Sequence, residues 1–269
     1  MSETSTVTDG TQNESPLVLS EVDAGVGTLT LNRPDSLNIL TREMIAALHG
    51  AVNSMLDDTN VRVIILAAQG RAFCAGHDLK EINGETEQDI ASLFGACSEM
   101  TEAIRLSPKP VIAQVQGMAV AAGVQLVASC DLVMASSEAK FGTTGIKAGL
   151  FCSSPMVPLS RVVQPRKALE MLFTGDLVDA VEAERIGLIN HVVEKEELAE
   201  ATRNLADRIA ANSGYSIRLG KQAFYQQLGL SPNAAYEVGR TAMVTNALAE
   251  DCLEGMTAFL EKRPPQYKH

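Results

Sequence analysis

The sequence predicts an α/β fold in which parallel strands alternate with helices, followed by a helical C-terminal region. Apolar runs rich in β-branched residues, at 61–67 and 110–115, have the composition of strands covered on both faces. Strand–turn–helix units recur along the chain, which indicates right-handed parallel crossovers. From Arg166 onward the apolar pattern becomes mainly helical.

The first predicted elements are a hairpin and a capped helix. Residues 17–22 and 26–31 are expected to be strands, joined across Asp23-Ala24-Gly25. After a loop at 33–36, Thr41 is a suitable N-cap for a helix. The apolar positions of that helix recur at 3.6-residue spacing: Met44, Ile45, Leu48, Val52, Met55 and Leu56.

The middle of the chain repeats a strand–turn–helix theme twice. Its predicted elements, in chain order, are a strand at 61–67, a glycine-rich turn at 70–78 leading into a helix that starts near Asp78, a strand at 110–115, a turn at Gly117, a helix of small residues at 119–129, and a strand at 133–135.

The last part of the chain is predicted to be mostly helical. Its elements are helices at 166–173 and 178–186, a strand at 189–193, and helices at 198–211, 216–228 and 234–260, with Gly255 as a candidate break in the last. The final helices carry too many apolar positions for an isolated tail, so we expect them to pack on a neighbouring subunit. The predicted organisation is a disordered tail at 1–16, a core at 17–200, and a helical oligomerisation region at 201–269.

Charge and hydropathy exclude several classes of partner. The net charge of −11 offers no attraction to nucleic acid or to anionic membranes. The most apolar stretch, 110–135, is interrupted by Gln114, Gln116, Gln125 and Asp131, so it is predicted to be core and not a membrane span. We therefore expect neither a nucleic acid nor a membrane as partner.

Cysteine and histidine usage predicts no metal and a reducing compartment. The five cysteines form no CxxC pair and are odd in number, which favours reduced, mostly buried thiols in a cytoplasmic protein. None of the four histidines has a metal-ligand spacing to another histidine or cysteine, so we expect no metal site. Residues 1–16 have no lysine, arginine or apolar run, and so resemble neither a secretory signal nor a transit peptide.

Two segments could direct backbone N–H groups at one ligand. In residues 71–81, small residues at 74–76 permit a tight turn and Asp78 can cap the next helix, although a simple loop would look the same. Residues 117–123 open a helix directly after a buried strand, although alanines there also suit close helix packing. If both donor sets converge, they form an oxyanion hole for a carbonyl oxygen.

Motifs along nearly the whole chain point to a known family. In order, they are TLNRP at 30–34, LN at 37–38, FCAGHDL at 73–79, PVIA at 110–113 running into Gly117, CDL at 130–132, FG at 141–142, TG at 174–175 with Ala183, GL at 187–188, and FLEKR at 259–263. In this order and spacing, the chain from Val18 to Lys268 resembles the enoyl-CoA hydratase/isomerase (crotonase) family. The resemblance implies a spiral of ββα units with a C-terminal helical trimerisation region.

The resemblance also implies a site for an acyl-CoA thioester in fatty acid metabolism. The backbone N–H groups of His77 and Ala122 would hold the thioester oxygen. Coenzyme A would enter only as part of the substrate, with no separate cofactor, and the assembly would be a homotrimer or a dimer of trimers. Residues expected to bind the coenzyme A portion are Leu37, Ala75, Gly76, Asp78, Leu79, Lys80 and Lys262, the last often from another subunit.

This chain departs from the family at three positions. Hydratases of the family carry one glutamate where this chain has Gln125 and a second where it has Gly145. Glutamine can position a water molecule but cannot take its proton, and glycine offers no side chain at all. No carboxylate lies between Glu138 and Glu170. Asp35 stands where members frequently carry a basic residue for a phosphate.

Other residues offer no clear replacement for the two carboxylates. The His77 imidazole is one candidate base, but the family does not require a side chain there. Cys152 would need a base or a lowered pKa to act as a nucleophile, so a buried thiol is the preferred interpretation. Lys140 and Lys147 are expected to be surface cations, and Asp131 to serve the fold.

The sequence therefore predicts a protein with the crotonase fold that binds acyl-CoA. We expect it to be classed as an enoyl-CoA hydratase but to be impaired in hydration that depends on two glutamates. Three alternatives stay open. The protein could catalyse another isomerase, hydrolase or lyase reaction that needs only the oxyanion hole. It could hydrate enoyl-CoA through a carboxylate from elsewhere in the fold. It could also be a non-catalytic acyl-CoA-binding subunit.

Overall fold

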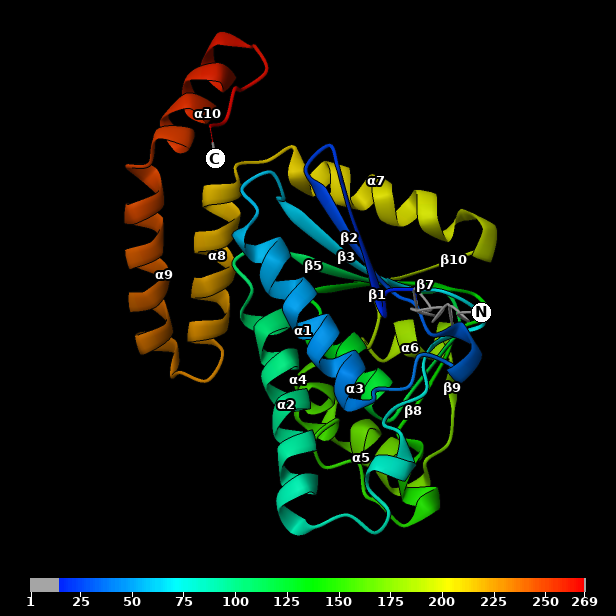
Figure 1. Ribbon diagram of the computed structural model, residues 1–269. Coiled ribbons are helices and arrows are strands. Elements are labelled where there is room, and N and C mark those ends of the chain that lie inside the picture. The colour runs from blue at the N-terminus through cyan, green and yellow to red at the C-terminus, as the bar shows by residue number, and fades with distance from the viewer. Residues whose placement is uncertain (1–14, 269) are drawn as a thin grey trace, which may run out of the picture.

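A computed structural model describes residues 15–268 and shows two β-sheets enclosed by helices, with three further helices extending to one side (Figure 1). The disordered tail expected at 1–16 lies almost entirely outside the described residues. The predicted α/β class is confirmed, since parallel strands alternate with helices through most of the chain.

The first sheet has six strands in the order β1-β2-β3-β5-β7-β10. The β1–β2 pair is the predicted antiparallel hairpin, whose turn places Ala24 and Gly25 at φ 46° and 87°. All the other pairs in this sheet are parallel. The bounds are β1 (Val18–Asp23), β2 (Val26–Leu31), β3 (Val63–Ala68), β5 (Val111–Val115), β7 (Leu132–Ser136) and β10 (His191–Val193).

Strand β3 shows why its sequence is continuously apolar. Ile64 and Leu66 belong to the main hydrophobic cluster, which lies toward the second sheet and the surrounding helices. Val63 and Ile65 belong to a second cluster on the opposite face, shared with helix α7 (Leu198–Ala210). Because successive residues point to opposite faces, both sets must be apolar.

The second sheet has four short strands in the order β4-β6-β8-β9. They are β4 (Ala72–Cys74), β6 (Met118–Val120), β8 (Lys140–Gly142) and β9 (Val178–Asp179). The sequence predicted a turn or a helix at three of these places, and those assignments are wrong. Strands of two or three residues are too short to show the alternation that distinguishes a strand. The first three strands run parallel, and β9 is antiparallel to β8.

Ten α-helices occur in the described part of the chain. Those not yet given are α1 (Arg42–Asp57), α2 (Glu87–Leu106), α3 (Ala122–Ser129), α4 (Met156–Val162), α5 (Pro165–Thr174), α6 (Ala180–Arg185), α8 (Gly214–Gln227), α9 (Pro232–Ala247) and α10 (Glu250–Glu261). Short 3-10 turns lie at Pro34–Ser36, Leu79–Glu81, Thr144–Ala148 and Lys195–Glu197.

Side-chain caps explain why one helix start was predicted correctly and another was not. Thr41 caps α1 as expected, with its hydroxyl oxygen accepting from Met44 N at 3.1 Å. The helix expected to start near Asp78 is wrong: Asp78 caps only the 3-10 turn, accepting from Lys80 N at 2.9 Å. The long helix α2 begins later, where the Thr86 hydroxyl accepts from Asp89 N at 3.2 Å.

The C-terminal helices divide into one that covers the sheet and three that leave it. Helix α7 spans the boundary expected between residues 200 and 201, and it packs on β3, β5 and β7. Helices α8, α9 and α10, here called the helical arm, extend away from the sheets (Figure 1). The chain breaks between α9 and α10 at Leu248-Ala249, and Gly255 lies within α10.

The helical arm is tied to the core by Asp131. Lys221 Nζ lies 2.6 Å from Asp131 Oδ2, and the Tyr225 hydroxyl donates to Asp131 Oδ1 at 3.0 Å. Asp131 Oδ2 also accepts from Val111 N at 2.8 Å, so one carboxylate joins α8 to β5. This arrangement confirms that Asp131 serves the fold. No helix in the described part of the chain combines the length and apolarity needed to cross a membrane.

Candidate functional site

The two segments predicted to supply amide donors lie against each other. Gly76 is buried at φ +93°. A methyl group on Gly76 would lie 2.9 Å from Ala121 Cβ, 3.3 Å from Val120 O and 3.5 Å from Ala122 N. The loop after β4 and the start of α3 therefore meet through a position that only glycine can occupy without strain.

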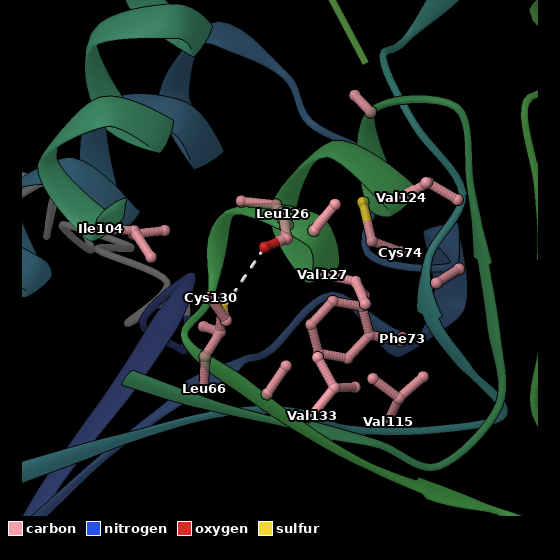
Figure 2. Packing of buried hydrophobic residues seen from close by; sticks show 14 of the residues in the cluster. Leu66, Phe73, Cys74, Ile104, Val115, Val124, Leu126, Val127, Cys130 and Val133 are labelled. Atoms are coloured by element: carbon pink, nitrogen blue, oxygen red, sulfur yellow. Dashed lines mark hydrogen bonds between the residues drawn. The ribbon is translucent and has the colours of Figure 1, made fainter. Parts of the chain in front are cut away.

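Sheet topology explains this meeting. Strands β4 and β6 are parallel neighbours, with Cys74 paired to Ala119, so the chain leaves both strands at the same edge of the sheet. Gly123 lets α3 approach β4 closely, since a methyl group there would lie 2.3 Å from Cys74 O. Side chains from α3, including Val124 and Val127, pack into the cluster with Phe73 and Cys74 (Figure 2).

The His77 and Ala122 amides are both free to donate to a ligand. Around His77, Leu40 N donates to Gly76 O at 2.7 Å and Asp78 N donates to Leu40 O at 3.4 Å. The His77 N–H itself has no acceptor among residues 15–268, and neither has the Ala122 N–H at the first position of α3. Two unpaired donors thus lie next to Gly76, at the positive end of the α3 dipole.

Ala121, which directly precedes the Ala122 donor, has a strained backbone. Its φ of 49° and ψ of −117° fall in a region that favours glycine. Its N–H donates to Gly142 O at 2.9 Å, and its carbonyl accepts from Val124 N at 3.0 Å. Non-glycine residues in such regions cost about 1–3 kcal/mol and concentrate at functional sites. No local pattern in the sequence signals this strain.

The residues expected to bind coenzyme A mostly lie together around the same loop. Ala75 N donates to Leu37 O at 3.1 Å, which joins the 3-10 turn at Pro34–Ser36 to the loop after β4. Leu79 is 55% exposed, and Lys80 is exposed without an ion pair in the part of the chain that the structure describes. This cluster presents an apolar side chain and a cation to solvent beside the two amides.

Lys262 is the exception among these residues. It ends α10 at φ 56° and is exposed. Helix α10 lies at the far end of the helical arm, well separated from α3 (Figure 1). One copy of the chain therefore does not bring Lys262 to the His77 and Ala122 amides. Asp35, the departure from the family's basic residue, is exposed on the 3-10 turn near Leu37.

The side chain of His77 packs against helix α2. Its ring makes an edge contact with Phe94 of α2, with centroids 5.3 Å apart and an interplanar angle of 80°. Burial lowers the pKa of His77 below its usual value, and the Leu40 backbone opposes this only in part. Nδ1 is buried without a hydrogen-bond partner among the described residues.

Gln125, at the position of the first family glutamate, is almost completely buried, with 2% of its surface exposed. Its Nε2 donates to Thr101 Oγ1 of α2 at 3.2 Å. Its Oε1 has no hydrogen-bond partner within residues 15–268. The amide therefore offers one buried acceptor at the start of α3.

Gly145, at the position of the second family glutamate, has no room beside it for a side chain. A methyl group there would lie 2.6 Å from Leu150 O and 2.9 Å from Cys152 Sγ. Leu150 N also donates to Gly145 O at 3.0 Å, which holds this turn closed. In the sequence, Gly145 is only a position without a side chain. The structure shows that the Leu150 carbonyl and the Cys152 thiol fill the space that a side chain would occupy.

The cysteines are buried thiols, as predicted. All five are free, and four are buried. Burial raises the pKa of Cys152, and it raises the pKa of Cys74 and Cys97 to about 12. These shifts hold the thiols protonated, so Cys152 is no activated nucleophile here.

Sequence reasoning missed Thr101 and Phe94, which place α2 against the site. Thr101 belongs to the buried stripe of α2 that also includes Leu93, Cys97, Met100 and Ile104. A polar residue within such an apolar stripe is the signal that could have identified it.

Comparisons with known proteins show which family this chain resembles. The family model described as enoyl-CoA hydratase/isomerase matches residues 21–269. "Enoyl-CoA hydratase domain-containing protein 3, mitochondrial" of Rattus norvegicus is 41% identical over 261 residues, covering 97% of this chain and 87% of the rat protein.

Two solved structures share the fold closely. An enoyl-CoA hydratase of Mycobacterium smegmatis is 44% identical with a TM-score of 0.92, covering 95% of this chain and 100% of that one. Human enoyl Coenzyme A hydratase domain-containing protein 3 is 42% identical with a TM-score of 0.91, covering 93% and 100%. The predicted crotonase fold is thereby confirmed.

The relatives correct one prediction and establish the family. The rat protein and its counterparts from Mus musculus and Homo sapiens are all named mitochondrial, which contradicts the expected cytoplasmic location. Free thiols indicate a reducing environment, and that alone does not single out the cytoplasm. The family model matches residues 21–269, and this match does not depend on the cellular compartment of the protein. This chain belongs to the enoyl-CoA hydratase/isomerase family.

Proposed function

We propose that this protein binds acyl-CoA thioesters, with the thioester oxygen accepting hydrogen bonds from the His77 and Ala122 amides. The observation that carries the proposal is the contact between the two donor segments at Gly76, together with the absence of any acceptor for either amide among the described residues. The coenzyme A portion then follows the surface formed by Leu37, Ala75, Gly76, Asp78, Leu79 and Lys80.

Such a pair of donors stabilises negative charge on the thioester oxygen. Removing one oxyanion-hole donor typically costs about 3–4 kcal/mol of transition-state stabilisation. The site has the donors but lacks the carboxylate pair for two-glutamate hydration. Gln125 is neutral, and the space at Gly145 is filled by Leu150 O and Cys152 Sγ. We therefore expect severely impaired hydration of enoyl-CoA.

Reactions that need only the polarised carbonyl fit this site better. Isomerisation, thioester hydrolysis or C–C cleavage could use a group supplied by the substrate to handle the proton. A non-catalytic acyl-CoA-binding role is the second candidate, favoured by the absence of a carboxylate at Gln125 and Gly145.

The helical arm supports assembly into a homotrimer or a dimer of trimers. Large apolar side chains are exposed along it, namely Phe224, Tyr236, Met243, Leu248, Phe259 and Leu260. Exposed apolar area on this scale suits a protein–protein interface. Since α10 is far from α3 in one copy, an arm from a second copy would have to supply Lys262 to the coenzyme A phosphates.

Titration calorimetry with butyryl-CoA tests the proposed function. We expect a dissociation constant well below about 1 mM, which corresponds to about −4 kcal/mol. Lys80→Ala should weaken binding about two- to five-fold, because exposed charge pairs contribute little. Lys140→Ala is the matched control. Lys140 lies at the amino end of β8, whereas the site follows the carboxyl ends of the parallel strands β4 and β6. The absence of binding at millimolar concentration would overturn the proposal.

A further inference from the structure

A cleft lies where the helical arm joins the core, between the end of α2 and a face of α8. Its volume is about 420 Å³, which is within the range of small-molecule sites. The turn at Ser107-Pro108 lines one side, and side chains of α8 line the other. The cleft is separate from the His77 amide, because Leu106 follows Phe94 by about 18 Å along α2.

Every charged residue that lines the cleft is a cation, although the chain as a whole carries a net charge of −11. Two of these three cations have carboxylate partners. Lys221 lies 2.6 Å from Asp131, and Arg105 lies 2.6 Å from Glu102. Arg218 is exposed, and its guanidinium has neither an ion pair nor a hydrogen bond in the described part of the chain. Arg218 can therefore pair with an anionic ligand.

Further polar groups follow Arg218 along α8. Gln222 and Gln226 come at four-residue intervals, so the three side chains lie in one row about 12 Å long. Both glutamines are exposed, and neither side-chain amide has a hydrogen-bond partner among the residues that the structure describes. The Arg218 guanidinium lies 5.3 Å from the centroid of the Tyr215 ring, a cation–π contact that holds it at the head of the row.

Apolar groups line the rest of the cleft. Leu106 is 60% exposed at the end of α2, and Pro108 follows it in the turn. The ring of Tyr225 also lines the cleft, while its hydroxyl is used by Asp131. A hydrocarbon chain placed here would remove exposed apolar surface from water, which is favourable. The cleft therefore suits a molecule that combines a negative charge with an apolar body.

We propose that this cleft binds an aliphatic carboxylate. The carboxylate pairs with Arg218, whose planar guanidinium can donate two parallel hydrogen bonds to it. The hydrocarbon chain lies on Leu106 and Pro108 and extends toward Tyr225. A single negative charge suits the cleft better than a phosphate dianion, because Lys221 and Arg105 are already paired. The site shares no residue with the proposed acyl-CoA site and does not depend on it.

Titration calorimetry of the full chain with sodium octanoate tests this site. We expect a dissociation constant below about 1 mM, and at least about tenfold lower than those of acetate, which lacks the chain, and 1-octanol, which lacks the charge. Saturation with butyryl-CoA should leave the affinity for octanoate unchanged, because the two sites are separate. If octanoate binds no more tightly than acetate or octanol, or if butyryl-CoA displaces it, the inference is wrong.

Variants of exposed side chains identify the responsible groups without disturbing the core. Arg218→Gln should weaken octanoate binding about tenfold, because it removes charge-assisted hydrogen bonds, and should not alter butyryl-CoA binding. Leu106→Ala should weaken the binding of octanoate but not that of acetate.

The matched control is Arg208→Gln. Arg208 is exposed in α7, has no ion pair in the described part of the chain, and does not line the cleft. This variant should bind octanoate as the original chain does. An octanoate affinity that Arg218→Gln leaves unchanged, or that Arg208→Gln lowers equally, would overturn the inference.

Discussion

Crotonyl-CoA incubated with this protein should be hydrated about 10²- to 10⁴-fold more slowly than the typical enzyme turnover of about 10 s⁻¹, because general acid–base catalysis contributes on that scale. Gln125 cannot take a proton from water, and no side chain exists at Gly145 to deliver one. A steady-state assay of enoyl-CoA consumption measures this directly. Turnover within tenfold of about 10 s⁻¹ would show that a carboxylate from elsewhere in the fold performs the reaction.

Restoring the carboxylates should succeed at only one of the two positions. Gln125→Glu places a carboxylate beside Thr101 and should raise the rate of hydration. Gly145→Glu meets Leu150 O and Cys152 Sγ, so it should lower the free energy of unfolding by about 1–3 kcal/mol and add no activity. From the sequence alone, the double variant would be expected to restore both groups. An increase in hydration by Gly145→Glu without loss of stability would contradict the packing around this glycine.

Gly123→Ala should lower the free energy of unfolding by about 3 kcal/mol, near the upper end of the usual cost of overpacking. The added methyl group would lie 2.3 Å from Cys74 O and 3.1 Å from Cys74 Cβ, so α3 would have to move away from β4. That movement would separate the Ala122 amide from the His77 amide, and acyl-CoA binding should be lost with stability.

The matched control is Gly220→Ala in α8, where no atom lies within 4 Å of the added methyl group. It should raise stability by up to about 1 kcal/mol, because alanine favours a helix over glycine. Chemical denaturation of both variants, with butyryl-CoA titration of each, compares the two effects. If Gly123→Ala were as stable as the original chain and still bound butyryl-CoA, the close approach of α3 and β4 would not be needed for the site.

Long elements with a clear period were predictable from the sequence. Helix α1 has both a side-chain cap and a buried stripe, and β3 has a continuous β-branched run that two hydrophobic clusters cover. The short strands β4, β6, β8 and β9 were not predictable, since a strand of two or three residues shows no period. The start of α2 was misplaced because Asp78 caps a 3-10 turn with the same local signal as a helix.

The sequence motifs identified the candidate site residues. The contacts of these residues in the fold determine how they are arranged. His77 and Ala122 were placed by resemblance, but their meeting depends on Gly76 and on the pairing of β4 with β6. The direction of the Gln125 amide depends on Thr101, 24 residues earlier on another helix. The filling of the space at Gly145 depends on the turn formed with Leu150 and Cys152. None of these contacts has a local sequence signature.

A crystal structure of the protein with butyryl-CoA tests most directly whether the two amides hold the thioester. We expect the thioester oxygen to lie about 2.7–3.1 Å from both the His77 and the Ala122 nitrogen atoms, the distance required of oxyanion-hole donors. A thioester bound away from Gly76, or with its carbonyl oxygen directed away from both amides, would contradict this binding mode.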